Sequence, residues 1–214
     1  MTAALQLRSR TVPFGPVEIR YDERVLTPRS WTLLQSRWAA EIAREVPAGP
    51  VLELCAGAGQ IGLAAAALTG RPLIQVDADP IACRYAVANA ARAGLADQVE
   101  VRHGRIDTAI HVGEHFPIIL ADPPYLPSAD VARWPEDPRS AIDGGTDGLD
   151  LVRACLEVAD RHLLVDGMLL LQVAGDDQAQ AVVAHLESAD HLRLTPRATR
   201  HHDGHRAVML LRAG

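Results

Sequence analysis

The sequence has 214 residues, of which 48% are hydrophobic and 22% charged, and its formal net charge is -6 at pH 7. This length and composition predict one globular domain, alone or with a short N-terminal extension. The acidic balance argues against a broad nucleic-acid-binding surface, which is usually basic.

Cysteine spacing and hydropathy exclude further classes of protein. Cys55, Cys83 and Cys155 are far apart and include no C-x-x-C pair, so they fit neither a disulfide framework nor a zinc site, and we expect no metal. No apolar run is long enough to span a membrane, and the N-terminus lacks the apolar core of a signal peptide. We therefore expect a cytoplasmic protein that does not contact a membrane.

The N-terminal part predicts a hairpin followed by a helix. Apolar residues alternate through positions 12–26 around Gly15 and Pro16, as in two short paired strands. Ser30 is expected to cap a helix that runs to about Val46, before the Pro- and Gly-rich stretch at 47–50. We expect residues 1–49 to form an N-terminal extension or lid and residues 50–214 to form the main domain.

From residue 51, short apolar runs alternate with helical segments. Asp79 and Pro80 stand where the N-cap and first residue of a helix are expected. The expected strands cover 51–54, 72–76, 99–102, 118–121, 168–173, 192–196 and 207–211, and the expected helices 60–68, 80–94, 149–163 and 179–188. This order predicts an α/β fold: a Rossmann-like, seven-stranded mixed sheet with helices on both faces and an antiparallel last strand.

A glycine-rich loop, residues 53–62, joins the first of these strands to its helix. Its glycines permit a tight turn and the close approach of a ligand, and Asp77, at the end of the next strand, is placed to accept hydrogen bonds from ribose hydroxyls. Gly57, Gly59 and Gly62 also spell the G-x-G-x-x-G of dinucleotide-binding proteins. The acidic Glu53 favours S-adenosylmethionine over NAD, because a carboxylate repels pyrophosphate and attracts an ammonium group.

A second motif, Asp122-Pro123-Pro124-Tyr125, directly follows the apolar strand at 118–121. Two prolines stiffen the corner, and ligands of such sheets bind beyond the carboxyl ends of the strands. The Asp122 side chain and a main-chain carbonyl can both accept hydrogen bonds from one NH2 group, and Tyr125 can stack on a planar amide or base. We therefore expect methyl transfer to a conjugated nitrogen, with Asp122, Pro123 and Tyr125 as the catalytic residues.

Together these features resemble the release-factor-type glutamine N5-methyltransferases, the HemK-like group. Residues 122–125 match that family's Asn-Pro-Pro-Tyr signature, and residues 25–29, 135–150 and 204–208 are also similar to it. The resemblance implies an acceptor site made by Asp122, Pro123, Pro124, Tyr125, Arg29 and Trp134. It implies S-adenosylmethionine bound by Glu53, Cys55, Ala56, Gly57, Gly59, Gln60, Asp77, Ala78, Arg105, Ile106 and Asp122.

The sequence departs from the family at several points, which keeps other functions open. Asp122 replaces the family's Asn; aspartate is commoner in enzymes that methylate adenine N6 or guanine N2, and a carboxylate cannot donate to a glutamine carbonyl. Arg105 stands where an acidic residue often contacts adenine, and we expect the family's helical N-terminal domain to be absent. The first hypothesis is an N-methyltransferase acting on a protein side-chain amide or a small molecule.

Two alternatives stand beside it. One is a nucleic-acid base methyltransferase, for which Arg24, Arg29, Arg133 and Arg139 would have to converge near the site. The other is an NAD-binding or non-catalytic Rossmann protein.

Two further residues have expected positions. Gln178 is expected at the surface and Trp31 in the core. The sequence leaves the oligomeric state open.

Overall fold

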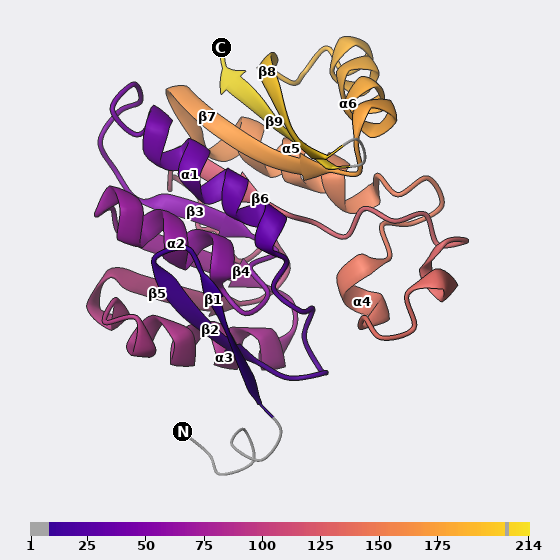
Figure 1. Ribbon diagram of the computed structural model, residues 1–214. Helices are drawn as coiled ribbons and strands as arrows, with labels where there is room; N and C mark the ends of the chain where they lie inside the picture. Colours follow the sequence, from indigo (N-terminus) through magenta and orange to yellow (C-terminus); the bar gives the residue numbers. More distant parts are fainter. Residues whose placement is uncertain (1–8, 204–205) are drawn as a thin grey trace.

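The computed structural model describes residues 9–203 and 206–214 (Figure 1), so Gly204 and His205 of the 204–208 similarity lie outside the described residues. Its main sheet has seven strands in the order β5-β4-β3-β6-β7-β9-β8. β9 runs antiparallel to both of its neighbours, and the other pairings are parallel. The predicted fold class is confirmed. The strands are β3 (Val51–Leu54), β4 (Leu73–Asp77), β5 (Val99–His103), β6 (Phe116–Ala121), β7 (Leu163–Val173), β8 (Leu194–Asp203) and β9 (Arg206–Ala213).

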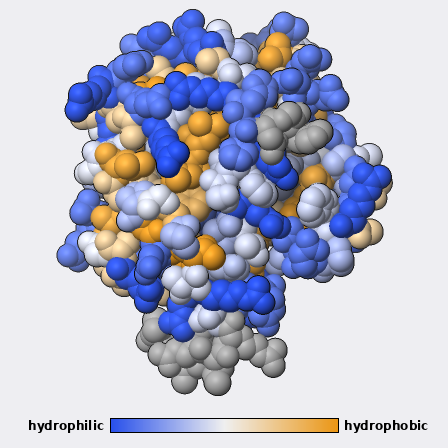
Figure 2. Space-filling model, viewed as in Figure 1, coloured by the Kyte–Doolittle hydropathy of each residue, from blue (hydrophilic) through white to orange (hydrophobic). Residues whose placement is uncertain are grey.

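Helices cover both faces of the sheet, as Figure 1 shows. One face carries a separate hairpin and the first three α-helices; the other carries α5 and α6. Figure 2 shows hydrophobic residues among hydrophilic ones over α1 and α2. The elements are β1 (Arg10–Phe14), β2 (Val17–Tyr21), α1 (Leu33–Ile42), α2 (Gln60–Thr69), α3 (Pro80–Arg92), α4 (Arg139–Ile142), α5 (Asp150–His162) and α6 (Asp176–Ser188), with 3-10 turns at Ser30–Thr32, Ala96–Gln98 and Val131–Arg133.

The start of α3 is built as predicted. Asp79 is the N-cap, its Oδ1 accepts a hydrogen bond of 2.7 Å from the main-chain N–H of Ile81, and Pro80 is the first helical residue. The cap satisfies one N–H that has no partner within the helix. It also fixes the direction in which the chain leaves β4, directly after Asp77.

Other boundaries differ from the prediction for physical reasons. Ser30 does not cap α1; it opens a 3-10 turn, and α1 begins at Leu33. β7 begins at Leu163, where α5 ends, and β8 continues to Asp203, well beyond the expected 196. Edge strands such as β8 need only backbone pairing, which an apolar pattern does not reveal.

Three buried polar side chains tie the N-terminal elements to the two motif loops. Asn89 in α3 accepts from the main-chain N–H of Arg20 in β2 at 2.8 Å and donates to the carbonyl of Ala58 in the glycine loop at 2.9 Å. Gln35 in α1 donates to the carbonyl of Ala121, just before Asp122, at 2.8 Å. Ser36 donates to the carbonyl of Ile61 at 2.8 Å. The hairpin and α1 also share a hydrophobic core with the sheet, while the domain boundary at residue 49 stays a prediction.

Within the part of the chain that the structure describes, no helix is both long and apolar enough to cross a bilayer. The same residues contain no group of three or more His, Cys, Asp and Glu side chains arranged to hold a metal ion.

Candidate active site

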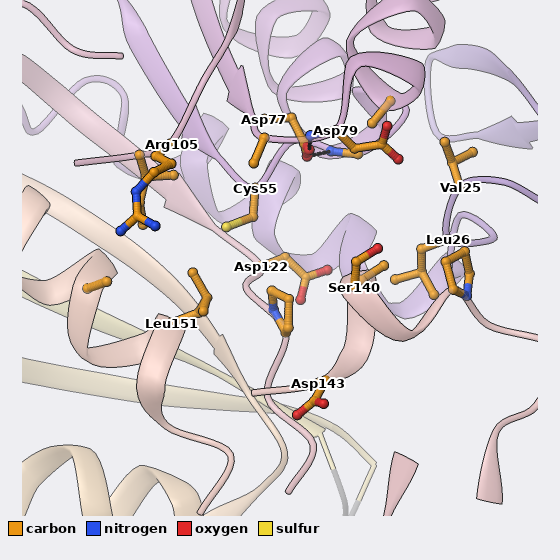
Figure 3. Close-up of a pocket in the computed structure, with 18 of the residues that line it drawn as sticks. Val25, Leu26, Cys55, Asp77, Asp79, Arg105, Asp122, Ser140, Asp143 and Leu151 are labelled. Atoms are coloured by element: carbon orange, nitrogen blue, oxygen red, sulfur yellow. Dashed lines mark hydrogen bonds between the residues drawn. The ribbon is translucent and has the colours of Figure 1, made fainter. Parts of the chain in front are cut away.

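The chain order of the strands reverses beside β3, because β4 and β5 lie on one side of it and β6 and β7 on the other. Ligands of doubly wound sheets bind at such a switch, beyond the carboxyl ends of the strands. A cavity of about 680 Å³ opens there, and we call it the large cavity (Figure 3). Its walls are Arg24, Val25, Leu26, Cys55, Gly57, Gln60, Asp77, Ala78, Asp79, Ala82, Arg105, Ile106, Asp107, Asp122, Pro124, Pro138, Ser140, Ala141, Asp143, Asp150, Leu151 and Ala154.

Asp77 is held rigidly in this wall. The main-chain N–H of Gly57 donates to its Oδ2 at 2.7 Å, and the N–H of Asp79 donates to its Oδ1 at 2.8 Å. Each carboxylate oxygen keeps a lone pair for a ligand hydroxyl. Burial raises the pKa of Asp77, against the opposing effect of these two hydrogen bonds. The loop N–H of Gly57 is thus occupied by a carboxylate of the protein, an arrangement that does not favour a ligand phosphate.

The glycines of the glycine loop have different surroundings. Cys55 and Gly57 adopt left-handed backbone conformations, with φ of 56° and 57°. A Cβ added to Gly57 would meet only the Gln60 side chain, at 3.9 Å, so this glycine faces open space in the cavity. A Cβ added to Gly59 (φ 88°) would lie 2.9 Å from the Gln75 amide and 3.3 Å from Ala86 Cα. Gly59 is therefore required for packing against the protein itself.

Three of the expected cofactor residues lie outside the lining of the large cavity, and their contacts with a cofactor stay a prediction. Glu53, Ala56 and Gly59 are buried beneath the loop, and none of them lines the large cavity among the described residues. Glu53 points toward α2, because alternate residues of β3 face opposite sides of the sheet. It accepts a hydrogen bond of 2.5 Å from Gln75 Nε2, and burial raises its pKa to about 8. Its carboxyl group therefore supports the loop from below.

The other expected cofactor residues all line the cavity: Cys55, Gly57, Gln60, Asp77, Ala78, Arg105, Ile106 and Asp122. Arg105 pairs with Asp107 at 3.0 Å and its side chain is 78% exposed, so its guanidinium lies at the rim. Ile106, Leu151 and Ala154 give the cavity an apolar wall near Arg105. Arg105 and Leu151 lie on one side of Asp122, and Val25 and Leu26 lie on the other (Figure 3).

Acidic side chains outnumber basic ones in the wall of the large cavity. Its described lining includes six aspartates, at positions 77, 79, 107, 122, 143 and 150, but only two arginines, Arg24 and Arg105. A wall of this composition favours a cationic ligand and disfavours a pyrophosphate.

A second cavity of about 260 Å³, which we call the aromatic pocket, adjoins the first. It shares Leu26, Asp122, Pro124 and Ala141 with the large cavity. All six expected acceptor-site residues line it, together with residues that were not expected there. The complete lining is Leu26, Arg29, Trp31, Thr32, Asp122, Pro123, Pro124, Tyr125, Leu126, Trp134, Asp137, Ala141, Ile142, Ala174 and Arg206.

Two arginines shape the polar side of the aromatic pocket. Arg29 Nη2 donates to both carboxylate oxygens of Asp137, at 2.8 and 2.6 Å, and the Asp137 side chain is only 5% exposed. The Arg206 guanidinium lies 3.9 Å from the ring centroid of Trp31. Trp31, expected to be a core residue, is instead a wall of this pocket. Arg206 and Trp31 are 175 positions apart, so no local pattern could have paired them.

Comparison with known proteins identifies the family. A release factor glutamine methyltransferase of Cereibacter sphaeroides is 33% identical over 210 residues, which cover 90% of this chain and 72% of that protein. The chain belongs to the release factor glutamine methyltransferase family. A Gloeobacter violaceus protein of the same name is 36% identical over 175 residues, covering 79% of this chain and 61% of that protein. A ribosomal protein uL3 glutamine methyltransferase of Bordetella pertussis is 32% identical, covering 78% and 58%. This chain thus spans about three fifths of the length of the last two relatives.

Other similarities concern smaller regions or the fold alone. A family model described as Conserved hypothetical protein 95 matches residues 36–133. The hMettl16 catalytic domain, solved in complex with MAT2A 3'UTR hairpin 1, has a TM-score of 0.71 and 14% identity, covering 89% of this chain and 72% of that one. A methyltransferase from Pyrococcus furiosus has a TM-score of 0.67 and 19% identity, covering 92% and 89%.

Residues 122–125, which we call the signature corner, lie where the two cavities meet. Burial raises the pKa of Asp122 to about 7. Burial likewise raises the pKa of Tyr125, and the nearby charge of Asp122 acts in the same direction. The corner therefore presents a carboxyl group of intermediate acidity and a neutral phenol to whatever enters the aromatic pocket.

The segment that follows the signature corner along the chain holds this corner in place. The main-chain N–H of Gly144 donates to the carbonyl of Leu126 at 2.8 Å, and the N–H of Leu126 donates to the carbonyl of Ile142 at 3.0 Å. Gln178 was expected at the surface but is part-buried, and its Nε2 donates to the carbonyl of Tyr125 at 2.8 Å. A lone glutamine near a helix start carries no signal in the sequence for such a contact.

Proposed function

We propose that this protein is an S-adenosylmethionine-dependent N-methyltransferase whose acceptor is the side-chain amide of a glutamine in a protein. The observation that carries the proposal is the position of Asp122, which lies in the walls of both cavities. A methyl donor in the large cavity and an acceptor in the aromatic pocket would meet at this residue. Holding the two reactants in line is the main contribution an enzyme makes to such a transfer.

The large cavity suits S-adenosylmethionine in three respects. Asp77 offers two fixed carboxylate oxygens for ribose hydroxyls, the acidic wall suits a cation, and Gly57 leaves room for a ligand close to the backbone. Gln60, in the same wall, has a buried Oε1 with no hydrogen-bond partner among the described residues, an acceptor available for an ammonium group. When bound, S-adenosylmethionine supplies an electrophilic methyl group on a positively charged sulfur.

The aromatic pocket suits a planar NH2-bearing group. Tyr125 and Trp134 provide flat apolar faces, and Asp122 provides acceptor oxygens for the N–H bonds. An amide nitrogen is a weak nucleophile because its lone pair is delocalised. Hydrogen-bond acceptors that hold both N–H bonds favour the rehybridisation of the nitrogen that accompanies methyl transfer. The NH2 group of a glutamine fits this requirement.

The names of the relatives indicate which proteins carry the acceptor. They are described as methylating a glutamine of a release factor or of ribosomal protein uL3. We propose that the acceptor of the present protein is likewise a glutamine side chain of another protein. Because release factors and ribosomal protein uL3 are both components of translation, we also propose that the protein works in the cytoplasm.

A second candidate function is methylation of a nucleic-acid base, favoured by Asp122, whose carboxylate accepts from an exocyclic NH2. The net charge of -6 opposes it, since sequence-independent affinity for nucleic acid comes from clustered cations. The arginines near the site are also neutralised by partners: Arg29 by Asp137, Arg133 by Asp130 and Arg139 by Asp143.

The deciding experiment is transfer of labelled methyl from S-adenosylmethionine to proteins, total RNA, genomic DNA and small-molecule extract, each at two salt concentrations. The proposal expects label in protein that is recovered as N5-methylglutamine. Label that enters RNA or DNA, falls steeply with salt and is lost in Asp122→Ala would replace the proposal with the second candidate.

A further inference from the structure

Arg24 is part of the lining of the large cavity. It directly precedes Val25 and Leu26, which lie across the cavity from Arg105 in Figure 3. Arg24 follows β2, outside the glycine loop and outside the signature corner. Nothing in the reaction described above uses it.

The side chain of Arg24 is braced from behind. Its Nε donates to both oxygens of Asp22, at 3.0 and 3.1 Å, and its Nη2 also contacts Oδ2. The Tyr85 hydroxyl donates to the same Oδ2 at 2.7 Å, and both Asp22 and Tyr85 are buried. The hydrogen bond from Arg24 lowers the pKa of Asp22 to about 2, so this carboxylate is ionised at neutral pH.

This bracing occupies only one edge of the guanidinium. The hydrogen bonds to Asp22 use Nε and Nη2, and the Arg24 side chain remains 40% exposed. A guanidinium has five N–H donors in a planar fork, and its second edge can bind another carboxylate in bidentate fashion. Arg24 is therefore a fixed donor group at one end of a cavity whose other charges are mainly negative.

Three positions in the large cavity define how S-adenosylmethionine would lie in it. This step rests on the proposed function. Asp77 fixes the ribose, and the apolar wall of Ile106, Leu151 and Ala154 suits the flat adenine near Arg105. The transferred methyl must lie at Asp122, where the aromatic pocket begins. The methionine end therefore extends past Asp122 toward the Arg24 end. Its carboxylate would be repelled by the ionised aspartates of the cavity.

We propose that Arg24, braced by Asp22 and Tyr85, binds the carboxylate of the methionine part of S-adenosylmethionine. Arg24 is then a specificity-determining residue for the donor, because it selects nucleosides that carry an amino-acid tail. It acts on donor affinity and placement, without touching the acceptor.

Calorimetry with two ligands tests this assignment. The first is S-adenosylhomocysteine; the second is its decarboxylated analogue, which keeps adenosine, sulfur and the amine but lacks the carboxylate. Wild-type protein is expected to prefer the first roughly ten- to hundredfold, the range for a charge-assisted hydrogen bond. Arg24→Gln is expected to remove this preference by weakening only the binding of S-adenosylhomocysteine. Arg105→Gln, the matched control at the adenine end, is expected to change both affinities by the same factor.

Because Arg24→Gln leaves the buried Asp22 without its cation, the double variant Asp22→Asn, Arg24→Gln is measured beside it, with thermal melting to verify folding. An equal loss of affinity for both ligands in these variants would overturn the role of Arg24, and so would the lack of a preference in wild type. Either result would leave the proposed function intact. Failure of wild type to bind either ligand would instead overturn the proposed function, and the assignment of Arg24 with it.

Discussion

The side-chain amide of Gln178, in α6, donates a hydrogen bond of 2.8 Å to the main-chain carbonyl of Tyr125, the last residue of the signature corner. The same Nε2 reaches the carbonyl of Gly148 at 3.3 Å, while Oε1 accepts from the N–H of Ala174 at 2.8 Å. One side chain thus joins the corner, the segment after it and the end of β7.

Gln178→Ala is expected to lower kcat roughly 10- to 100-fold, because an acceptor site displaced by a fraction of an ångström loses alignment with the donor. The affinity for S-adenosylhomocysteine is expected to change less than about twofold, since Gln178 does not line the large cavity. Gln180→Ala, at an exposed position of the same helix, is the control. Equal kcat in the two variants would show that Gln178 does not position the corner.

Asp122→Ala is expected to reduce turnover by about 10²–10³, the scale for removing one preorganised contact to a transition state, with little change in donor affinity. Steady-state kinetics and calorimetry together provide the two readouts. Unchanged turnover would remove Asp122 from the mechanism.

Turnover of the wild type is also expected to increase as pH rises through the pKa of Asp122, about 7 without ligand, because the ionised carboxylate accepts both N–H bonds. Asp122→Asn keeps an acceptor oxygen that does not titrate. Its profile between pH 5.5 and 8.5, a window of roughly 1.5 units on either side of that pKa, is expected to be flat. Superimposable profiles for the two proteins would contradict this role.

Gly57→Ala and Gly59→Ala are expected to fail in different ways. At Gly57 the added methyl projects into the large cavity, so ligand binding weakens while unfolding free energy falls only by the roughly 1–2 kcal/mol of a left-handed conformation. At Gly59 it also collides with Gln75 and Ala86, and we expect a loss of about 2–4 kcal/mol. Urea unfolding and calorimetry separate the two effects. Identical behaviour of the two variants would be inconsistent with the loop geometry.

The buried Glu53 is expected to make stability pH-dependent. Burial raises its pKa from 4.5 to about 8, so between these values the native state retains a proton that the unfolded chain has released. The free energy of unfolding of the ligand-free protein should therefore fall as pH rises through this window, by up to about 1.4 kcal/mol per pH unit. Asp122 acts in the same direction.

Glu53→Gln stays neutral and keeps an oxygen for the Gln75 amide, so this slope is expected to decrease. Urea titrations at several pH values in this window measure it, and Glu45→Gln at an exposed position is the control. Glu114 and Asp22, whose pKa values arginines lower to about 2, lose their stabilising contribution only at more acidic pH. A slope unaltered by Glu53→Gln would show that Glu53 does not retain the proton.

The features that could be predicted from the sequence are those that local sequence rules control. The Asp79–Pro80 helix start, the glycine loop and the stiff corner at Asp122 all depend on a few consecutive residues. The sequence did not reveal that Glu53 points toward α2, because β3 is short and buried on both faces, so no pattern of exposure shows which way each side chain points. Arg206, Trp31 and Gln178 were missed because their roles depend on contacts between distant segments.

The hydrogen bonds of Asn89 with Arg20 and Ala58, and of Gln35 with Ala121, show that the hairpin and α1 help to shape both cavities. Transplanting this region between family members would therefore be a change to the site itself. A chimera with a foreign hairpin and α1 should be functional only when it conserves the polar residue equivalent to Gln35 and the backbone that meets Asn89. Segment-exchange libraries across the family should show this pairing as a constraint on which crossovers survive.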